Sequence, residues 1–175
     1  MNEIKEKEMD IKTIIIAEKY TFDDYVSAIN ESDDFDINQT SYGNTSLLQE
    51  AIKAEKYDIA MDLVRRKIDL NHQDRYGHTA LHYLCAKPKC IELVEMILKA
   101  GANPNIKNEN NMTPIYSMTA NTNGNYKDTG VKYEMMELLL KYGADINIDR
   151  DGKKPVDVAK TIEDKKALEI LEKYE

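Results

Sequence analysis

Cysteine, proline and long apolar runs are scarce in this sequence. Its 175 residues include two cysteines, four prolines and seven glycines, while 42% are hydrophobic and 32% are charged, which is the composition of a folded chain. No stretch approaches the roughly 20 apolar residues of a membrane span, and acidic residues flank the short apolar run near the start, unlike a signal peptide. Cys85 and Cys90 form no disulfide framework. We therefore expect a cytoplasmic protein with reduced thiols.

Negative charge is concentrated near the start of the chain. The formal net charge is −8, and residues 1–40 hold eleven Asp and Glu against four Lys, a net of −7. Nucleic-acid phosphates are bound through Lys and Arg, so this charge argues against a nucleic-acid partner. It suits a basic protein partner, or it simply keeps the chain soluble. Composition leaves both interpretations open.

The sequence contains an internal repeat. Each copy opens on a turn signal, and the first three signals, Gly43, Gly77 and Asn111, lie 34 residues apart. Gly152 follows after a further 41 residues, so the third copy carries an insertion. The four openings are SYGNTSLLQEAI from Ser41, RYGHTALHYLC from Arg75, ENNMTPIYSM from Glu109 and RDGKKPVDVA from Arg150. A repeat of this length predicts stacked supersecondary units.

A second signature closes the first three copies. An apolar run of helical period precedes it each time, and in the run from Ile91 the residues Leu93, Val94, Ile97 and Leu98 share one buried face. Gly residues follow two of these runs, where a helix end favours a left-handed cap. The closing signatures are KIDLN at 67–71, AGANPN at 100–105 and YGADIN at 142–147. The predicted unit is therefore a turn, a short helix, a longer helix and a loop.

These motifs resemble the ankyrin repeat, which has a period near 33 residues and a T-P-L-H-x-A opening. Thr79–His82 and Thr113–Ile115 match the opening, while Gly101–Asn103 and Gly143–Asn147 match the usual ending. The resemblance covers about residues 39–175. It implies an all-α solenoid of about five stacked helix pairs, with loops that project sideways as fingers.

The two ends of the chain are expected to be caps, because the terminal repeats of a solenoid need a polar outer face. We expect N-terminal capping helices in residues 1–38 and three repeats in residues 39–148, the third with an insertion at 120–132. A C-terminal capping repeat is expected in residues 149–175. Caps at both ends argue against a fragment of a larger scaffold. The sequence departs from the family pattern in two places: the first repeat has one residue too many, and Lys154 replaces a Thr.

One stretch gathers residues with potential metal or catalytic chemistry. His78, His82, Cys85 and Cys90 follow an H-x3-H-x2-C-x4-C spacing, which matches no closed zinc site. The resemblance places His82 at the motif histidine, which bonds the neighbouring backbone, and places His78 at a fingertip, pointing elsewhere. Cys85 with His82 is the sole candidate for a nucleophile and its base, and the fold would bury it. We expect no metal, no cofactor and no enzymatic activity.

Two acidic pairs and a glycine are weaker candidates for catalytic chemistry. Asp23 with Asp24 and Asp33 with Asp34 look like paired carboxylates, but nothing in the sequence places them in an apolar cleft that would tune their pKa values. Gly124 is isolated, and no Gly-rich phosphate loop occurs.

The resemblance implies that partners are bound by finger residues and by the exposed side of each first helix. Tyr42 and Tyr76, with Arg75 alongside, have the composition of an interface hot spot. The alternative is that each tyrosine only fills its hairpin. The candidate partner-binding residues are Tyr42, Asn44, Arg75, Tyr76, His78, Tyr83, Lys87, Asn110, Met112 and Tyr126. Gln49 and Ser117 are expected on the same exposed helix side.

The insertion ANTNGNYKDTGVK, residues 120–132, is polar and has one aromatic residue, Tyr126. A long polar loop is either a disordered tip or a functional contact.

The leading hypothesis is a non-enzymatic protein-binding module that is a monomer when free. Small standalone ankyrin proteins of this kind resemble bacterial immunity proteins, which neutralise a toxin by binding it, and the acidic balance would suit a basic toxin domain. The alternatives are a host-directed effector or regulatory scaffold, and a metal protein or enzyme.

Overall fold

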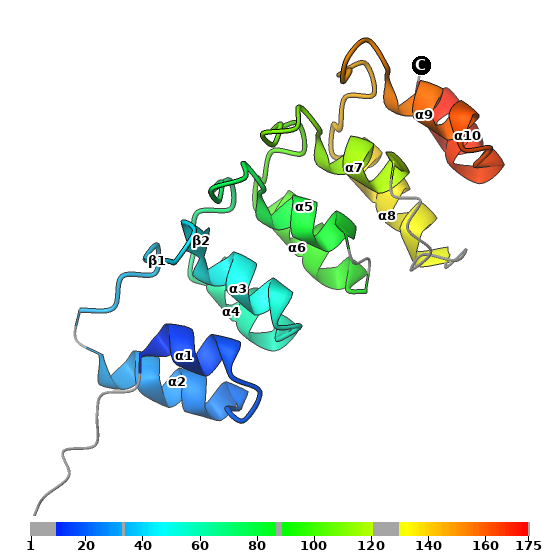
Figure 1. The fold of residues 1–175 in the computed structure, drawn as a ribbon. Coiled ribbons are helices and arrows are strands. Elements are labelled where there is room, and N and C mark those ends of the chain that lie inside the picture. Colours follow the sequence, from blue (N-terminus) through cyan, green and yellow to red (C-terminus); the bar gives the residue numbers. More distant parts are fainter. Residues whose placement is uncertain (1–9, 33, 87–88, 121–129, 175) are drawn as a thin grey trace, which may run out of the picture.

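The computed structural model describes residues 10–32, 34–86, 89–120 and 130–174. Within these residues the chain forms ten helices and one two-stranded sheet. The helices form five consecutive pairs stacked in a row (Figure 1), which confirms the predicted helical solenoid. The pairs are α1 (Ile11–Ile16) with α2 (Phe22–Glu31), α3 (Leu47–Lys53) with α4 (Tyr57–Arg65), α5 (Ala80–Ala86) with α6 (Ile91–Lys99), α7 (Pro114–Ala120) with α8 (Gly130–Lys141), and α9 (Pro155–Thr161) with α10 (Lys165–Glu172).

The helices form two layers along the stack. The first helices of the pairs, from α1 through α3, α5 and α7 to α9, each contact the next in this order, and the second helices, from α2 to α10, do the same. Apolar side chains fill the space between the layers. The stripe predicted in α6 is confirmed, because Leu93, Val94, Ile97 and Leu98 are all buried. Each pair is therefore stabilised mainly by its neighbours.

The loops between successive pairs project to one side of the stack as fingers (Figure 1). In the first finger, β1 (Thr40–Ser41) pairs antiparallel with β2 (Thr45–Ser46), a small sheet that the all-helical prediction did not include. Gly43 and Gly77 have φ of 85° and 72°, and Asn111 takes the same left-handed conformation at 58°. Gly152 has φ of 76°, so all four predicted turn signals are confirmed.

An asparagine that follows each of the first three helix pairs connects one finger base to the next. Asn71 and Asn105 end the first two closing signatures, and Asn38 holds the equivalent place after the first pair. Each side-chain Oδ1 accepts a hydrogen bond from a backbone N–H about one repeat further along the chain. The bonds run from Asp69 N to Asn38 at 2.9 Å, from Asn103 N to Asn71 at 2.8 Å and from Asp145 N to Asn105 at 2.8 Å. This ladder explains why the signature ends in Asn.

The second helices of the three central pairs end on a left-handed residue. Gly101 and Gly143, the predicted caps, have φ of 99° and 87°. After α4 the same conformation is taken by Lys67, with φ of 64°, although its side chain disfavours it. The helix end is therefore imposed by the stack and does not depend on glycine.

The segment predicted as an insertion is partly helical. Ala120 is the last residue of α7, and α8 begins at Gly130, so Lys132 belongs to the helix. Residues 121–129 lie outside the described residues. Lys132 is buried and its Nζ donates to Asp164 Oδ2 at 2.7 Å, which joins α8 to the N-terminus of α10.

Candidate partner-binding surface

Tyr42, Arg75 and Tyr76 lie together on two adjacent fingers, and we call these three residues the fingertip patch. The Arg75 guanidinium carbon is 5.6 Å from the ring centroid of Tyr42 and 4.6 Å from that of Tyr76. Arg75 Nη2 also donates to the Tyr76 hydroxyl at 2.6 Å. Tyr42 is 92% exposed and Tyr76 is 49% exposed, so the patch presents aromatic surface to solvent. The sequence prediction that these residues are neighbours is consistent with this geometry.

Backbone hydrogen bonds fix the fingers against one another. Arg75 N–H donates to the Gly43 carbonyl at 2.9 Å, and Glu109 N–H donates to the Tyr76 carbonyl at 3.0 Å. Gly77 is required here, because a Cβ at this position would lie 2.8 Å from the backbone nitrogen of Glu109. The fingertip patch is thus carried by a rigid ladder of loops.

Two further candidates, His78 and Tyr83, turn inward around Asp74. The Tyr83 hydroxyl donates to Asp74 Oδ2 at 2.5 Å, and His78 Nδ1 lies 3.7 Å from the same oxygen. Asp74 Oδ1 accepts from the backbone N–H groups of Tyr76 and His78. Burial alone would raise the pKa of Asp74, but the hydrogen bonds from Tyr83 and the two amides lower it below its usual value. The carboxylate is therefore ionised and holds the finger in shape.

His82 has the structural role that the resemblance implied. The backbone N–H of Thr79 donates to Nδ1 at 3.1 Å, so Nε2 carries the proton and donates to the Met112 carbonyl at 2.9 Å. Burial lowers the pKa of His82 to about 4. The prediction that His78 points away from His82 was wrong, because their ring centroids are 5.6 Å apart. The inward turn of His78 toward Asp74 and Tyr83 brings the rings together.

Three other candidates are engaged in the fingers themselves. Asn44 Nδ2 donates to the Gln73 carbonyl at 2.9 Å, and the backbone N–H groups of Asn110 and Met112 donate to Asn108 Oδ1. Their backbones thus shape the loops, while the side chain of Asn110 remains exposed. Lys87 and Tyr126 lie outside the described residues.

Gln49 does not lie on an exposed helix side as the sequence suggested. It is fully buried, and its Nε2 donates to the His78 carbonyl at 2.7 Å. Its Oε1 accepts from the backbone N–H of Ser46 at 2.8 Å. Gln49 therefore takes the place of His82 in its own repeat. The extra residue before Ser46 shifts the register, and this shift is the signal that could have revealed the equivalence.

The thiols and histidines offer little reactive chemistry. Burial raises the pKa of the Cys85 thiol, so the nucleophilic thiolate is disfavoured. Among residues 10–174, outside the gaps given above, no group of three or more His, Cys, Asp or Glu side chains is arranged to hold a metal ion.

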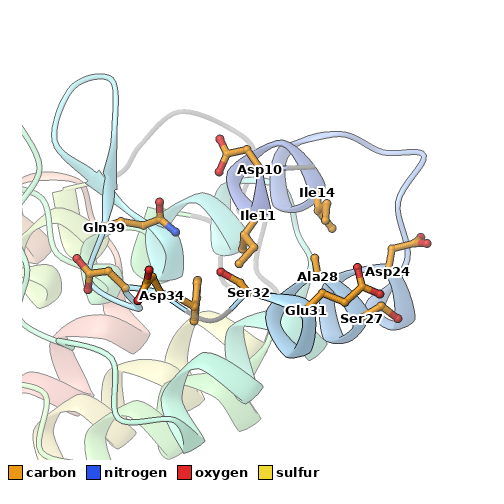
Figure 2. A pocket seen from close by; sticks show the side chains of 12 residues that line it. Asp10, Ile11, Ile14, Asp24, Ser27, Ala28, Glu31, Ser32, Asp34 and Gln39 are labelled. Carbon is orange, nitrogen blue, oxygen red and sulfur yellow. The ribbon is translucent and has the colours of Figure 1, made fainter. Parts of the chain in front are cut away.

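A hollow of about 710 Å³ lies beside the first helix pair (Figure 2). Asp24 and Asp34 line this hollow together with Ile11 and Ile14, but most of its other lining residues are polar or acidic. The backbone and side chain of Thr21 donate to Asp24, and these bonds lower its pKa. Asp24 is thus ionised and completes the capping box of α2 with the N-cap residue Thr21, and the hollow is acidic.

Two family models match this chain. A model of three ankyrin repeats matches residues 14–108, and a model of one ankyrin repeat matches residues 110–151. The chain belongs to the ankyrin-repeat family. The first match includes α2 and the end of α1, which the sequence resemblance had left out. Ankyrin repeats imply a protein–protein interaction module, and neither matched model describes a catalytic domain.

Relatives with ankyrin repeats come from diverse organisms. The chain is 35% identical over 104 residues to the transient receptor potential cation channel subfamily A member 1 of Homo sapiens, covering 58% of this chain and 8% of the channel. It is 26% identical over 129 residues to the ankyrin repeat protein FPV024 of fowlpox virus, covering 73% of this chain and 20% of that protein. It is 35% identical over 88 residues to the ankyrin repeat protein L92 of Acanthamoeba polyphaga mimivirus, covering 50% and 19%.

The ankyrin chain spans at most a fifth of the length of these three relatives. None of the three is named as an immunity protein, so they lend no support to that finer resemblance. In the described part of the chain, no helix has the length and apolar character needed to cross a membrane.

Proposed function

We propose that this ankyrin protein binds a protein partner through the fingertip patch. The observation that carries the proposal is the pair of solvent-exposed aromatic rings, Tyr42 and Tyr76, which both lie against the Arg75 guanidinium. Tyr and Arg are enriched among residues that dominate binding energy, and a tyrosine loses little conformational entropy when it is covered. A rigid loop ladder beneath them lowers the ordering cost further.

The alternative role, in which each tyrosine only fills its hairpin, fits Tyr42 poorly. A side chain that is 92% exposed contributes little to the packing of its own finger. Tyr76 does stack on Arg75 and lies 6.2 Å from the His78 ring, so part of its surface has a structural role. The exposed half of Tyr76 and nearly all of Tyr42 remain for a partner.

The outer face of the stack is a weaker candidate. There α6 presents charges such as Glu95, which pairs with Lys99 at 2.8 Å on the same helix. Exposed pairs of this kind contribute little to binding or stability. Glu92 beside them is also exposed and offers no aromatic surface.

In its finer form, the proposal is that the partner is a basic protein, such as a toxin domain that this chain neutralises. The support is electrostatic: the net charge is −8, and residues 1–40, which include all the lining residues of the acidic hollow, account for −7 of it. A test is to co-express the chain with a toxin encoded directly upstream of its gene. Growth that is rescued by the chain supports this role, and a neighbouring gene without toxicity argues against it.

Site-specific photo-crosslinking tests the surface and identifies the partner in the same experiment. A benzophenone amino acid replaces Tyr42 in one variant and Glu92 on the outer face in the matched control. After irradiation in extract of the native cell, we expect a discrete crosslinked protein from the Tyr42 position only, identified by mass spectrometry. A discrete product from the Glu92 position alone would contradict the assignment.

A further inference from the structure

The Arg75 guanidinium has no acidic partner among the residues that the structure describes. Its contacts are the Tyr76 hydroxyl and the two tyrosine rings. By contrast, Arg66 Nε pairs with Asp62 at 2.6 Å. A guanidinium has five N–H donors, and the bond to Tyr76 occupies one of them. Arg75 therefore retains donors for a group that the described residues do not supply.

Two acidic residues, one beside Arg75 in the sequence and one at its position in the next finger, make no ion pair with it in the described residues. Asp74, the preceding residue, directs both carboxylate oxygens to Tyr83 and to backbone amides. Glu109, at the same position of the next finger, bonds Tyr76 through its backbone but makes no ion pair with Arg75 in the described residues. The three residues of the fingertip patch thus carry one positive charge, that of Arg75, which neither carboxylate pairs with directly.

The Arg75 side chain is also held in position before any partner arrives. Its stem crosses Gly43 of the preceding finger, where an added Cβ would lie 3.4 Å from Cδ and 3.5 Å from Nε. The two rings and the Tyr76 hydroxyl fix the guanidinium beyond it. A long side chain that is already ordered loses less entropy when it binds.

We propose that Arg75 binds a carboxylate of the partner protein, next to an aromatic or large apolar residue that covers Tyr42. The planar guanidinium matches a carboxylate in a two-point hydrogen bond, which makes the contact directional as well as electrostatic. This inference rests on the proposed function, since it names the chemistry that the fingertip patch recognises. A basic partner can satisfy it, because one acidic residue at the contact is sufficient.

The test uses displayed libraries of random twelve-residue peptides, one with a fused C-terminus and one with a free C-terminus, selected on the full chain at physiological salt. We expect the selected peptides to carry Asp or Glu beside an aromatic or apolar residue. Replacing that acid with its amide, or Arg75 with Gln, should weaken binding at least tenfold. The two changes together should weaken binding little more than either change alone, because both remove the same contact. If only free-terminus peptides bind and amidation abolishes binding, the carboxylate is a chain terminus.

Arg65→Gln is the matched control, because Arg65 is an exposed arginine on the second-helix layer and the change removes the same charge. We expect less than a twofold effect, and Arg75→Lys should lose at least threefold because it keeps the charge without the fork. Equal effects of Arg65→Gln and Arg75→Gln would overturn the inference, as would a selection without acidic peptides. Peptides that are sensitive to Tyr76→Ala but not to loss of their acid would leave the proposed function standing and refute the carboxylate. Peptide binding that is unaffected by substitutions at both Arg75 and Tyr76 would refute the proposed function itself.

Discussion

His82 Nε2 lies 2.9 Å from the carbonyl oxygen of Met112, which is 30 residues further along the chain and in the next finger. Gln49 makes the equivalent bond to the His78 carbonyl in the preceding repeat. A neutral imidazole and an amide thus make equivalent hydrogen bonds that connect one repeat to the next. A glutamine at position 82 can therefore keep the hydrogen bond while removing the group that titrates.

The first prediction is that the free energy of unfolding of His82→Gln falls less than that of the wild type as the pH is lowered. Burial lowers the pKa of His82 from 6.5 to about 4, so between these pH values the unfolded chain binds a proton at this residue and the folded chain does not. The contribution of His82 to the free energy of unfolding is therefore complete above pH 6.5 and is lost as the pH falls toward 4. Between pH 7 and pH 4.5 the wild type should lose roughly 2 kcal/mol more than the variant. Urea unfolding at both pH values measures this. Carboxylates are common to both proteins, so their titration cancels in the comparison. Equal losses of unfolding free energy in the two proteins would contradict the prediction.

The core gives a second prediction. Leu81 and Leu139 are 1% and 0% exposed in different repeats, so each change to Ala should lower the free energy of unfolding by roughly 2–5 kcal/mol through lost contacts and a cavity. Denaturant melts provide the measurement. Losses below about 0.5 kcal/mol for both variants would contradict the repeat register.

The third prediction is that replacing Lys67 stabilises the protein. Its φ of 64° is unfavourable for a residue with a Cβ, and the equivalent positions in the next two repeats are Gly101 and Gly143. Lys67→Gly should therefore raise the free energy of unfolding by roughly 0.5–1 kcal/mol. Lys67→Ala is the matched control, because it removes the charge and keeps the Cβ. Equal stability of the two variants in thermal melts would show that the backbone at this position is unstrained.

The contact between Lys132 and Asp164 leads to a fourth prediction. Both side chains are nearly buried, at 8% and 12% exposure, so Asp164→Ala leaves an uncompensated charge and should cost about 3–5 kcal/mol. It also removes the bond from Ala167 N–H that caps α10. Lys132→Met combined with Asp164→Ala should recover part of this loss in urea unfolding. A double variant as unstable as the sum of both single variants would contradict an ionic coupling.

Much of the fold followed from the repeat period. The 34-residue spacing of Gly43, Gly77 and Asn111 predicted the turns, and the spacing within α6 predicted its buried face. Such features are local, because they depend on helical period and on residues that tolerate a left-handed backbone. A single sequence therefore contains them in readable form.

Other features depend on contacts that sequence spacing does not encode. Tyr83 was expected to face a partner, but its hydroxyl bonds Asp74, and no local pattern distinguishes the two outcomes. Lys132 was assigned to a polar insertion, and its burial depends on Asp164, 32 residues away. The fingertip patch was predicted because tyrosines precede the turn glycine in two successive repeats, so that the period itself brings them together.

The most direct test of the central claim is calorimetry of the complex with the partner identified by crosslinking. Arg75→Ala combined with Tyr76→Ala should weaken binding by at least about 2 kcal/mol, about thirtyfold, whereas Glu92→Ala with Glu95→Ala should change it by less than about 0.5 kcal/mol. Both double variants must first show wild-type folding by circular dichroism, because Tyr76 also contacts its own finger. If the outer-face pair is the sensitive one, or if both pairs are silent while Tyr126→Ala abolishes binding, then the fingertip patch is not the binding surface.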